Sequence, residues 1–125
     1  MRKFKVLSNG IKIPSIGFGT YKSGDNNETA EIVKYALECG YRQIDTASFY
    51  GNEVGIGNAI KESKVKREDI FLVTKLWNDD HGYDKTIEAF NYSLKRLQFE
   101  YLDLYLIHWT SKLIADTLWA FDDLF

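Results

Sequence analysis

The 125 residues are 45% hydrophobic and 27% charged, which is enough apolar material for the core of one globular domain. The net charge of -2, with basic and acidic residues interleaved, gives no electrostatic reason to expect nucleic acid or an anionic membrane as a partner. No run of eighteen apolar residues and no secretory signal is present, so we expect a cytoplasmic protein that acts on small molecules.

The chain opens with a predicted β-hairpin. Two short alternating segments, 4–7 and 11–13, flank the turn Ser8-Asn9-Gly10, and Asn-Gly between such segments is a strong hairpin signal.

Short apolar strands then alternate with amphipathic helical segments, as expected for a parallel sheet built from βα units. Asp25 to Asn27 offer capping side chains for the first helix, and Gly40 suits the position just past its end. We predict four units, whose strands and helices are 15–20 with 29–38, 42–46 with 53–62, 70–75 with 84–97, and 102–107 with 114–125.

Three successive strands end in an ionisable residue, namely Asp45, Lys75 and His108. The carboxyl ends of parallel strands lie on one rim, so we expect these side chains to converge where active sites of such folds are found. For any one of them, the simpler interpretation is a polar residue that marks where a strand reaches water.

Tyr50 lies five residues beyond Asp45, in a loop that could fold its phenol over the same rim. A phenol is an inefficient acid near neutrality, and a neighbouring ammonium such as that of Lys75 favours loss of its proton. Asp45 could hold the ammonium, and His108 could orient a carbonyl oxygen. Taken alone, Tyr50 would be interpreted as a packed aromatic.

His81 stands in the polar segment Asn78 to Gly82, which could suggest a metal site. One histidine in a glycine-containing loop is usually exposed to solvent, so we expect His81 to be exposed and predict no metal.

Several motifs together resemble the aldo-keto reductase family. The resemblance covers nearly the whole chain, in family order, and its most specific part is GYRQIDTA at residues 40–47 with YGNE at 50–53. Further matches lie at residues 16–20 (IGFGT), 56–57 (IG), 73–77 (VTKLW) and 101–109 (YLDLYLIHW).

The resemblance implies an enzyme that reduces aldehydes or ketones with NADPH. It implies Tyr50 as the proton donor, Lys75 and Asp45 as the residues that tune it, and His108 as the residue that orients the substrate. It also implies a set of binding residues. These are Gly19, Thr20, Tyr21 and Asp45 near the cofactor, and Tyr21, Trp77, His108 and Trp109 around the substrate.

The family fold is a (β/α)8 barrel closed below by an N-terminal hairpin, and such a barrel needs about 250 residues. Residues 1–125 are therefore expected to be a truncated N-terminal half of one barrel domain, without most of the cofactor site. Its two open sheet edges favour self-association. The alternative is an inactive half-barrel or a binding module. The carbonyl substrate and the choice between NADPH and NADH stay open.

Overall fold

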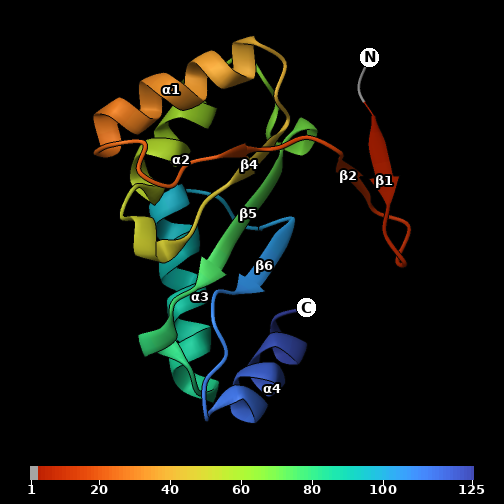
Figure 1. Cartoon of the computed structure of the whole chain (residues 1–125), viewed down its shortest axis with the longest axis vertical. Coiled ribbons are helices and arrows are strands. Elements are labelled where there is room, and N and C mark those ends of the chain that lie inside the picture. The colour runs from red at the N-terminus through yellow and green to blue at the C-terminus, as the bar shows by residue number, and fades with distance from the viewer. Residues whose placement is uncertain (1–2) are drawn as a thin grey trace.

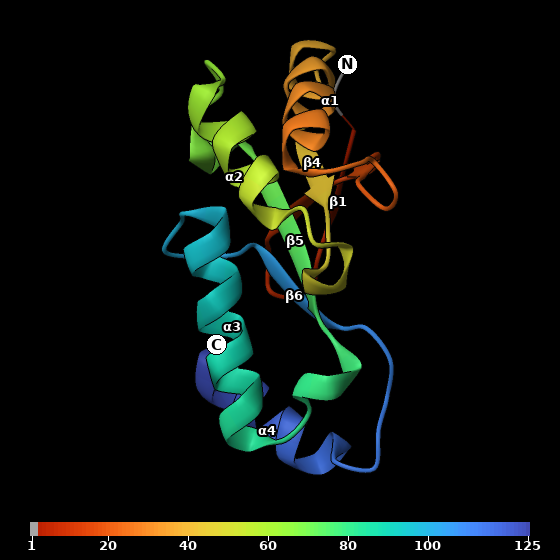
Figure 2. The ribbon, with the colours of Figure 1, turned by 90° about the vertical axis from the view of Figure 1, so that its left-hand side faces the viewer.

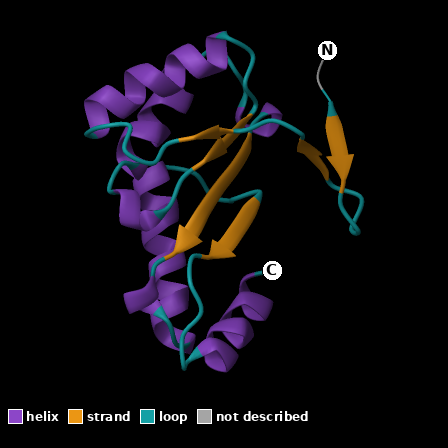
Figure 3. Ribbon diagram, viewed as in Figure 1, coloured by secondary structure: helices purple, strands orange, loops and turns teal. Residues whose placement is uncertain are grey.

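The protein consists of a four-stranded parallel sheet covered by helices and a separate antiparallel hairpin (Figures 1 and 3). The computed structural model describes residues 3–125, so residues 1 and 2 of the expected 1–125 domain lie outside it. The four predicted βα units and the hairpin are all present.

The hairpin pairs β1 (Phe4–Val6) with β2 (Lys12–Pro14), with Lys5 opposite Ile13. Gly10 has a φ of 83°, a left-handed conformation that glycine adopts without steric cost, and this closes the predicted turn. Figure 1 shows the hairpin standing apart from the helices, on the other side of the sheet.

The parallel sheet has the order β3, β4, β5, β6, which is also the order along the chain. Its strands are β3 (Phe18–Gly19), β4 (Gln43–Asp45), β5 (Phe71–Leu76) and β6 (Leu104–Ile107). Strands β3, β4 and β6 are each shorter than the predicted segments 15–20, 42–46 and 102–107. Just before β6, the Asp103 amide donates to the Leu72 carbonyl oxygen, and the Asp103 carboxylate accepts from the Leu72 amide and pairs with Arg67.

Helices α1, α2 and α3 stand side by side over one face of the sheet (Figure 2). The four helices are α1 (Asn26–Glu38), α2 (Glu53–Glu62), α3 (Tyr83–Leu97) and α4 (Ile114–Leu124). Helix α1 begins before Thr29, the predicted start, because Asp25 and Glu28 form a reciprocal capping box of two 2.9 Å hydrogen bonds. Gly40 follows α1 with a φ of 97°, as predicted.

The core lies between the sheet and these helices. Ile44 and Leu72 are fully buried in the centre of the sheet and pack against Val33 of α1, Ile56 of α2 and Leu97 of α3. Apolar residues at helical spacing therefore face alternate residues of the strands, as the sequence pattern predicts.

Three short 3-10 helices complete the fold: η1 (Ser48–Tyr50), η2 (Arg67–Asp69) and η3 (Asn78–Asp80). Of these, η1 and η3 follow the carboxyl ends of β4 and β5, where the predicted site lies. The strand order, with β3 and β6 as edges, is that of half a (β/α)8 barrel. Within residues 3–125, no helix is long and apolar enough to cross a membrane.

Candidate active site

Asp45 and Lys75 form an ion pair at the carboxyl end of the sheet. Asp45 ends β4, and Lys75 is the penultimate residue of β5. The Lys75 ammonium donates to the Asp45 carboxylate and, over 2.8 Å, to the carbonyl oxygen of Thr46. Lys75 points away from the helices because its neighbour Thr74 is fully buried and bonded to α2. The structure thus brings together two of the predicted residues.

Tyr50 and His108 lie beside this pair. Tyr50 ends η1, and its ring centroid is 5.2 Å from the Lys75 Nζ atom. The His108 ring stands edge-on to the Tyr50 ring, with the centroids 5.9 Å apart. The four residues expected to carry the chemistry, distant in sequence, therefore surround one point of the rim.

The surroundings of His108 favour the neutral form of its imidazole. Burial, and then the positive charge of Lys75, lower the pKa of its imidazole below the ordinary value of 6.5, while Asp45 acts in the opposite direction. Its Nδ1 atom is buried and finds no hydrogen-bond partner among residues 3–125. A neutral imidazole keeps one N–H, which can donate to an oxygen at the rim.

An aromatic wall stands next to His108. Phe49 and Trp77 are stacked with centroids 3.9 Å apart, and Trp77 lies 5.3 Å from the His108 ring. Trp109 continues the wall, with its centroid 6.1 Å from that of Trp77, and is 65% exposed. Both tryptophans expected near the substrate therefore lie together, whereas Phe49 was not predicted.

The segment expected near the cofactor borders the same rim. Tyr21 is exposed, and its ring centroid is 5.0 Å from that of Tyr50. Gly19 is exposed and pairs with Asp45 across the sheet. Thr20 is fully buried, and its amide and hydroxyl both donate to the Asp45 carbonyl oxygen, at 3.0 and 3.1 Å. The Thr20 side chain is thus a structural link within the sheet.

Asn52 connects the ends of the first two parallel strands and was not among the predicted site residues. Its amide group donates to the Thr20 carbonyl oxygen over 2.9 Å, and its side-chain oxygen accepts from the Thr46 hydroxyl over 3.0 Å. Since Thr46 also accepts from Lys75, Asn52 fixes the backbone that holds the ammonium. The residue lies within the motif at 50–53, which is the only sequence signal for it.

Glu53 connects the third strand to two helices. Its carboxylate is 1% exposed, accepts from the Thr74 hydroxyl over 2.7 Å and pairs with Arg96 Nε over 2.6 Å. Arg96 lies on α3, forty-three residues away, so no local pattern could have predicted the pair. A buried carboxylate of this kind needs both partners to offset its loss of water.

The expectation that His81 is exposed was wrong. His81 is 3% exposed, because its two ring nitrogens find partners in Thr117 of α4 and in the carbonyl oxygen of Trp109. The loop interpretation missed this, since both partners come from a later unit of the chain. Within residues 3–125, no three His, Cys, Asp or Glu side chains gather as metal ligands would.

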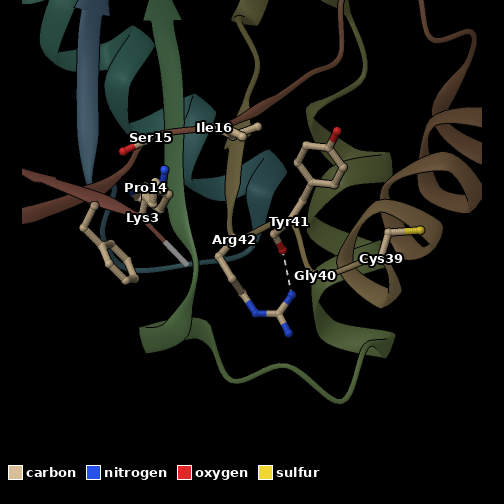
Figure 4. Close-up of a pocket in the computed structure, with 9 residues that line it drawn as sticks. Lys3, Pro14, Ser15, Ile16, Cys39, Gly40, Tyr41 and Arg42 are labelled. Carbon is tan, nitrogen blue, oxygen red and sulfur yellow. Dashed lines mark hydrogen bonds between the residues drawn. The ribbon is translucent and has the colours of Figure 1, made fainter. Parts of the chain in front are cut away.

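A hollow of about 580 Å³ opens at the opposite end of the sheet (Figure 4). It lies between the hairpin and the end of α1, and its lining includes Pro14, Ile16, Cys39 and Tyr41. None of the residues predicted for catalysis or binding lines it. The residues predicted for the site therefore lie away from this hollow.

The chain belongs to the aldo-keto reductase family, whose sequence model, described as the Aldo/keto reductase family, matches residues 15–123. Among curated relatives, it is 54% identical over 106 residues to glyoxal reductase of Bacillus subtilis (strain 168). The aligned region covers 85% of this chain and 38% of that enzyme.

Solved structures give the same result. An aldo/keto reductase from Brucella melitensis superposes with a TM-score of 0.95 at 49% identity, over 99% of this chain and 48% of that one. A Bombyx mori aldo-keto reductase in complex with NADP superposes with a TM-score of 0.87 at 35% identity, over 98% of this chain and 46% of that one. The chain spans less than half the length of these relatives, and the fold is half of their α/β barrel.

Proposed function

We propose that this chain carries the proton-donating half of an NADPH-dependent reductase that converts aldehydes or ketones to alcohols, with Tyr50 as the proton donor. The observation that carries the proposal is the placement of the Lys75 ammonium, which is paired with Asp45 and lies 5.2 Å from the Tyr50 ring. The imidazole of His108, whose pKa is lowered by burial and by Lys75, stands edge-on to the same ring.

In the proposed reaction, Tyr50 gives its phenolic proton to the carbonyl oxygen of the substrate. The ammonium of Lys75 stabilises the phenolate that remains, and Asp45 keeps the ammonium in place. His108 donates a hydrogen bond to the same oxygen and so orients the carbonyl group. NADPH, when bound, supplies the hydride that the carbonyl carbon gains. Water then returns a proton to Tyr50.

The nicotinamide end of the cofactor fits the residues present. At Gly19, no atom lies within 4 Å of the point where a Cβ would stand, so a flat ring can approach the backbone there. Asp45 keeps a third of its side-chain surface exposed on the same rim. We propose that Gly19, Thr20, Tyr21 and Asp45 border the cofactor, with Thr20 acting through its backbone.

The aromatic rings at the rim support a carbonyl substrate with an apolar part. Tyr21, Trp77 and Trp109 present flat apolar surfaces on either side of Tyr50 and His108. The name of the relative from Bacillus subtilis supports a small carbonyl compound as a first substrate to test.

We further propose that residues 1–125 form half of one barrel domain and that its open edges associate with a second copy. The accessible surface is 7809 Å², which is about 900 Å² above the roughly 6,900 Å² expected for a monomer of this mass. A standard interface buries about 800 Å² per partner. The helices beside the two open edges also expose large apolar side chains, Ile32 and Tyr35 on α1 and Leu118 and Trp119 on α4.

Sedimentation of the purified chain tests the association, because a monomer at micromolar concentration would contradict it. The enzymatic proposal is tested with the same sample. We expect NADPH to quench tryptophan fluorescence saturably and glyoxal to be reduced. Tyr50→Phe should lower turnover by about 10²- to 10⁴-fold and keep NADPH binding.

Tyr92→Phe, on the exposed side of α3, is the matched control and should behave like the unmodified chain. A folded chain that binds no NADPH would instead favour the second candidate, a non-catalytic half-barrel or binding module. Equal turnover by Tyr50→Phe and the unmodified chain would remove Tyr50 from the chemistry.

A further inference from the structure

His81 is a buried imidazole that the proposed reaction does not use. It lies between η3 and α3 and is 3% exposed. Its Nε2 atom is 2.7 Å from the carbonyl oxygen of Trp109, and its Nδ1 atom is 2.9 Å from the Thr117 hydroxyl. The same hydroxyl accepts a 3.0 Å hydrogen bond from the amide of Gly82.

One arrangement of protons satisfies every group in this chain of hydrogen bonds. A carbonyl oxygen only accepts, so His81 Nε2 carries a proton and donates it to Trp109. The Gly82 amide only donates, so the Thr117 hydroxyl accepts from it and directs its own proton to His81 Nδ1. The bonds then run in one direction from Gly82 through Thr117 and His81 to Trp109.

This chain of bonds anchors the loop between β6 and α4. At its start, the His108 amide donates to the Leu76 carbonyl oxygen. From Trp109 to Leu113, within the part of the chain that the structure describes, the bond from His81 is the one hydrogen bond that joins the loop backbone to an earlier unit. The bond from His81 therefore restrains the backbone at Trp109.

We propose that His81 is a positioning residue that sets the place of Trp109 in the aromatic wall and thereby favours substrates with an aromatic group. The effect on substrates rests on the proposed function, in which Trp109 contacts the carbonyl compound. The Trp109 ring is 6.1 Å from Trp77, which in turn lies 5.3 Å from His108. A shift of the loop would therefore open the wall on the side away from Tyr50 and Lys75.

The experiment compares three variants of the 125-residue chain. His81→Leu removes both polar contacts at similar volume, His81→Gln keeps an N–H that can reach the Trp109 carbonyl oxygen, and Thr117→Val breaks the other end of the chain of bonds. Indole N–H signals in two-dimensional NMR report the tryptophans without any turnover. We expect His81→Leu to shift the signals of Trp77 and Trp109 and His81→Gln to restore them in large part.

Kinetics with two aldehydes give the second readout. We expect His81→Leu to raise the KM for benzaldehyde about tenfold, the worth of one aromatic contact, and to leave kcat and the KM for propanal unchanged. Unchanged indole signals in His81→Leu would overturn the proposal. An equal loss for both aldehydes would overturn the link to substrate choice. If His81→Leu does not fold, His81→Gln and Thr117→Val carry the test, because Thr117→Val should shift the same two signals.

The two proposals can fail separately. Absence of carbonyl reduction by the unmodified chain would count against the proposed function, and the indole signals would still decide whether His81 holds Trp109 in place.

Discussion

The Ser48 hydroxyl donates a 3.1 Å hydrogen bond to the carbonyl oxygen of Lys75. Ser48 begins the turn that ends at Tyr50, and Lys75 belongs to the central strand β5. This bond therefore joins the proposed proton donor to the strand that supplies its cationic neighbour.

Ser48→Ala should lower the free energy of unfolding by about 1 kcal/mol, the net worth of a hydrogen bond of this kind. Urea unfolding followed by circular dichroism measures the change. Ser8→Ala, at an exposed turn position, is the control and should stay within about 0.5 kcal/mol of the unmodified chain. Equal stability of the two variants would mean that the Ser48 bond does not hold the turn.

Arg96→Leu should destabilise the fold by about 3 kcal/mol, because it leaves the buried Glu53 carboxylate without its cation. This value is at the lower end of the range for removing one partner of a buried ion pair, because 40% of the Arg96 side chain is exposed. Adding Glu53→Gln to Arg96→Leu should recover most of the loss in urea unfolding. Lys95→Met, at an exposed neighbouring position, is the control. A double variant no more stable than Arg96→Leu would contradict the interpretation.

Tyr105→Phe should stabilise the chain by about 1 kcal/mol near neutral pH, because the buried Tyr105 hydroxyl has no hydrogen-bond partner among residues 3–125. Burial, and then the charge of Glu53, also raise the pKa of this phenol above its ordinary value of 10.0. The unfolded chain therefore loses the proton first as the pH rises, and stability falls above about pH 10.

Urea midpoints at pH 8 and pH 10.5 test both effects. The drop between the two pH values should be smaller in Tyr105→Phe than in the unmodified chain. Tyr35→Phe, at a 69% exposed position, should leave the drop unchanged. A larger loss of stability between pH 8 and pH 10.5 in Tyr105→Phe than in the unmodified chain would contradict a raised pKa of the Tyr105 phenol.

His108 should titrate below the ordinary histidine value, in a way that depends on its two charged neighbours. Lys75→Met should raise the pKa of His108 and Asp45→Asn should lower it, because the lysine opposes the protonated form and the aspartate favours it. NMR titration of the imidazole signals, assigned with His108→Gln, measures both. Shifts of the same sign in the two variants would exclude this electrostatic account.

The lowered pKa of His108 also has a consequence for stability. As the pH falls through about 6.5, the unfolded chain binds the proton before the folded chain does, so stability decreases towards acidic pH. The free energy of unfolding should therefore decrease less towards acidic pH in His108→Gln than in the unmodified chain.

Much of the fold and the rim could be predicted from local pattern. Alternation of strands and amphipathic helices indicated the parallel sheet, and such a sheet places Asp45, Lys75 and His108 on one rim whatever the details of packing. Tyr50 needed the family resemblance, because nothing in its own segment shows that η1 directs the ring towards Lys75.

The parts that could not be predicted are contacts between distant units. Glu53 meets Arg96 across two helices, and His81 meets Trp109 and Thr117 from the following unit. A polar residue at such a position looks like a solvated one until its partner is known. The composition of the segment around His81 therefore favoured the wrong interpretation.

The agreement between strand order and chain order bears on how the protein is made. Each strand of the sheet pairs with the one synthesised just before it, so a nascent chain can add one unit at a time without waiting for a distant segment. Asp45 and Lys75 belong to adjacent strands of this series. We expect the ion pair to form while α3 is still emerging from the ribosome, before Trp109 can join Phe49 and Trp77 in the aromatic wall.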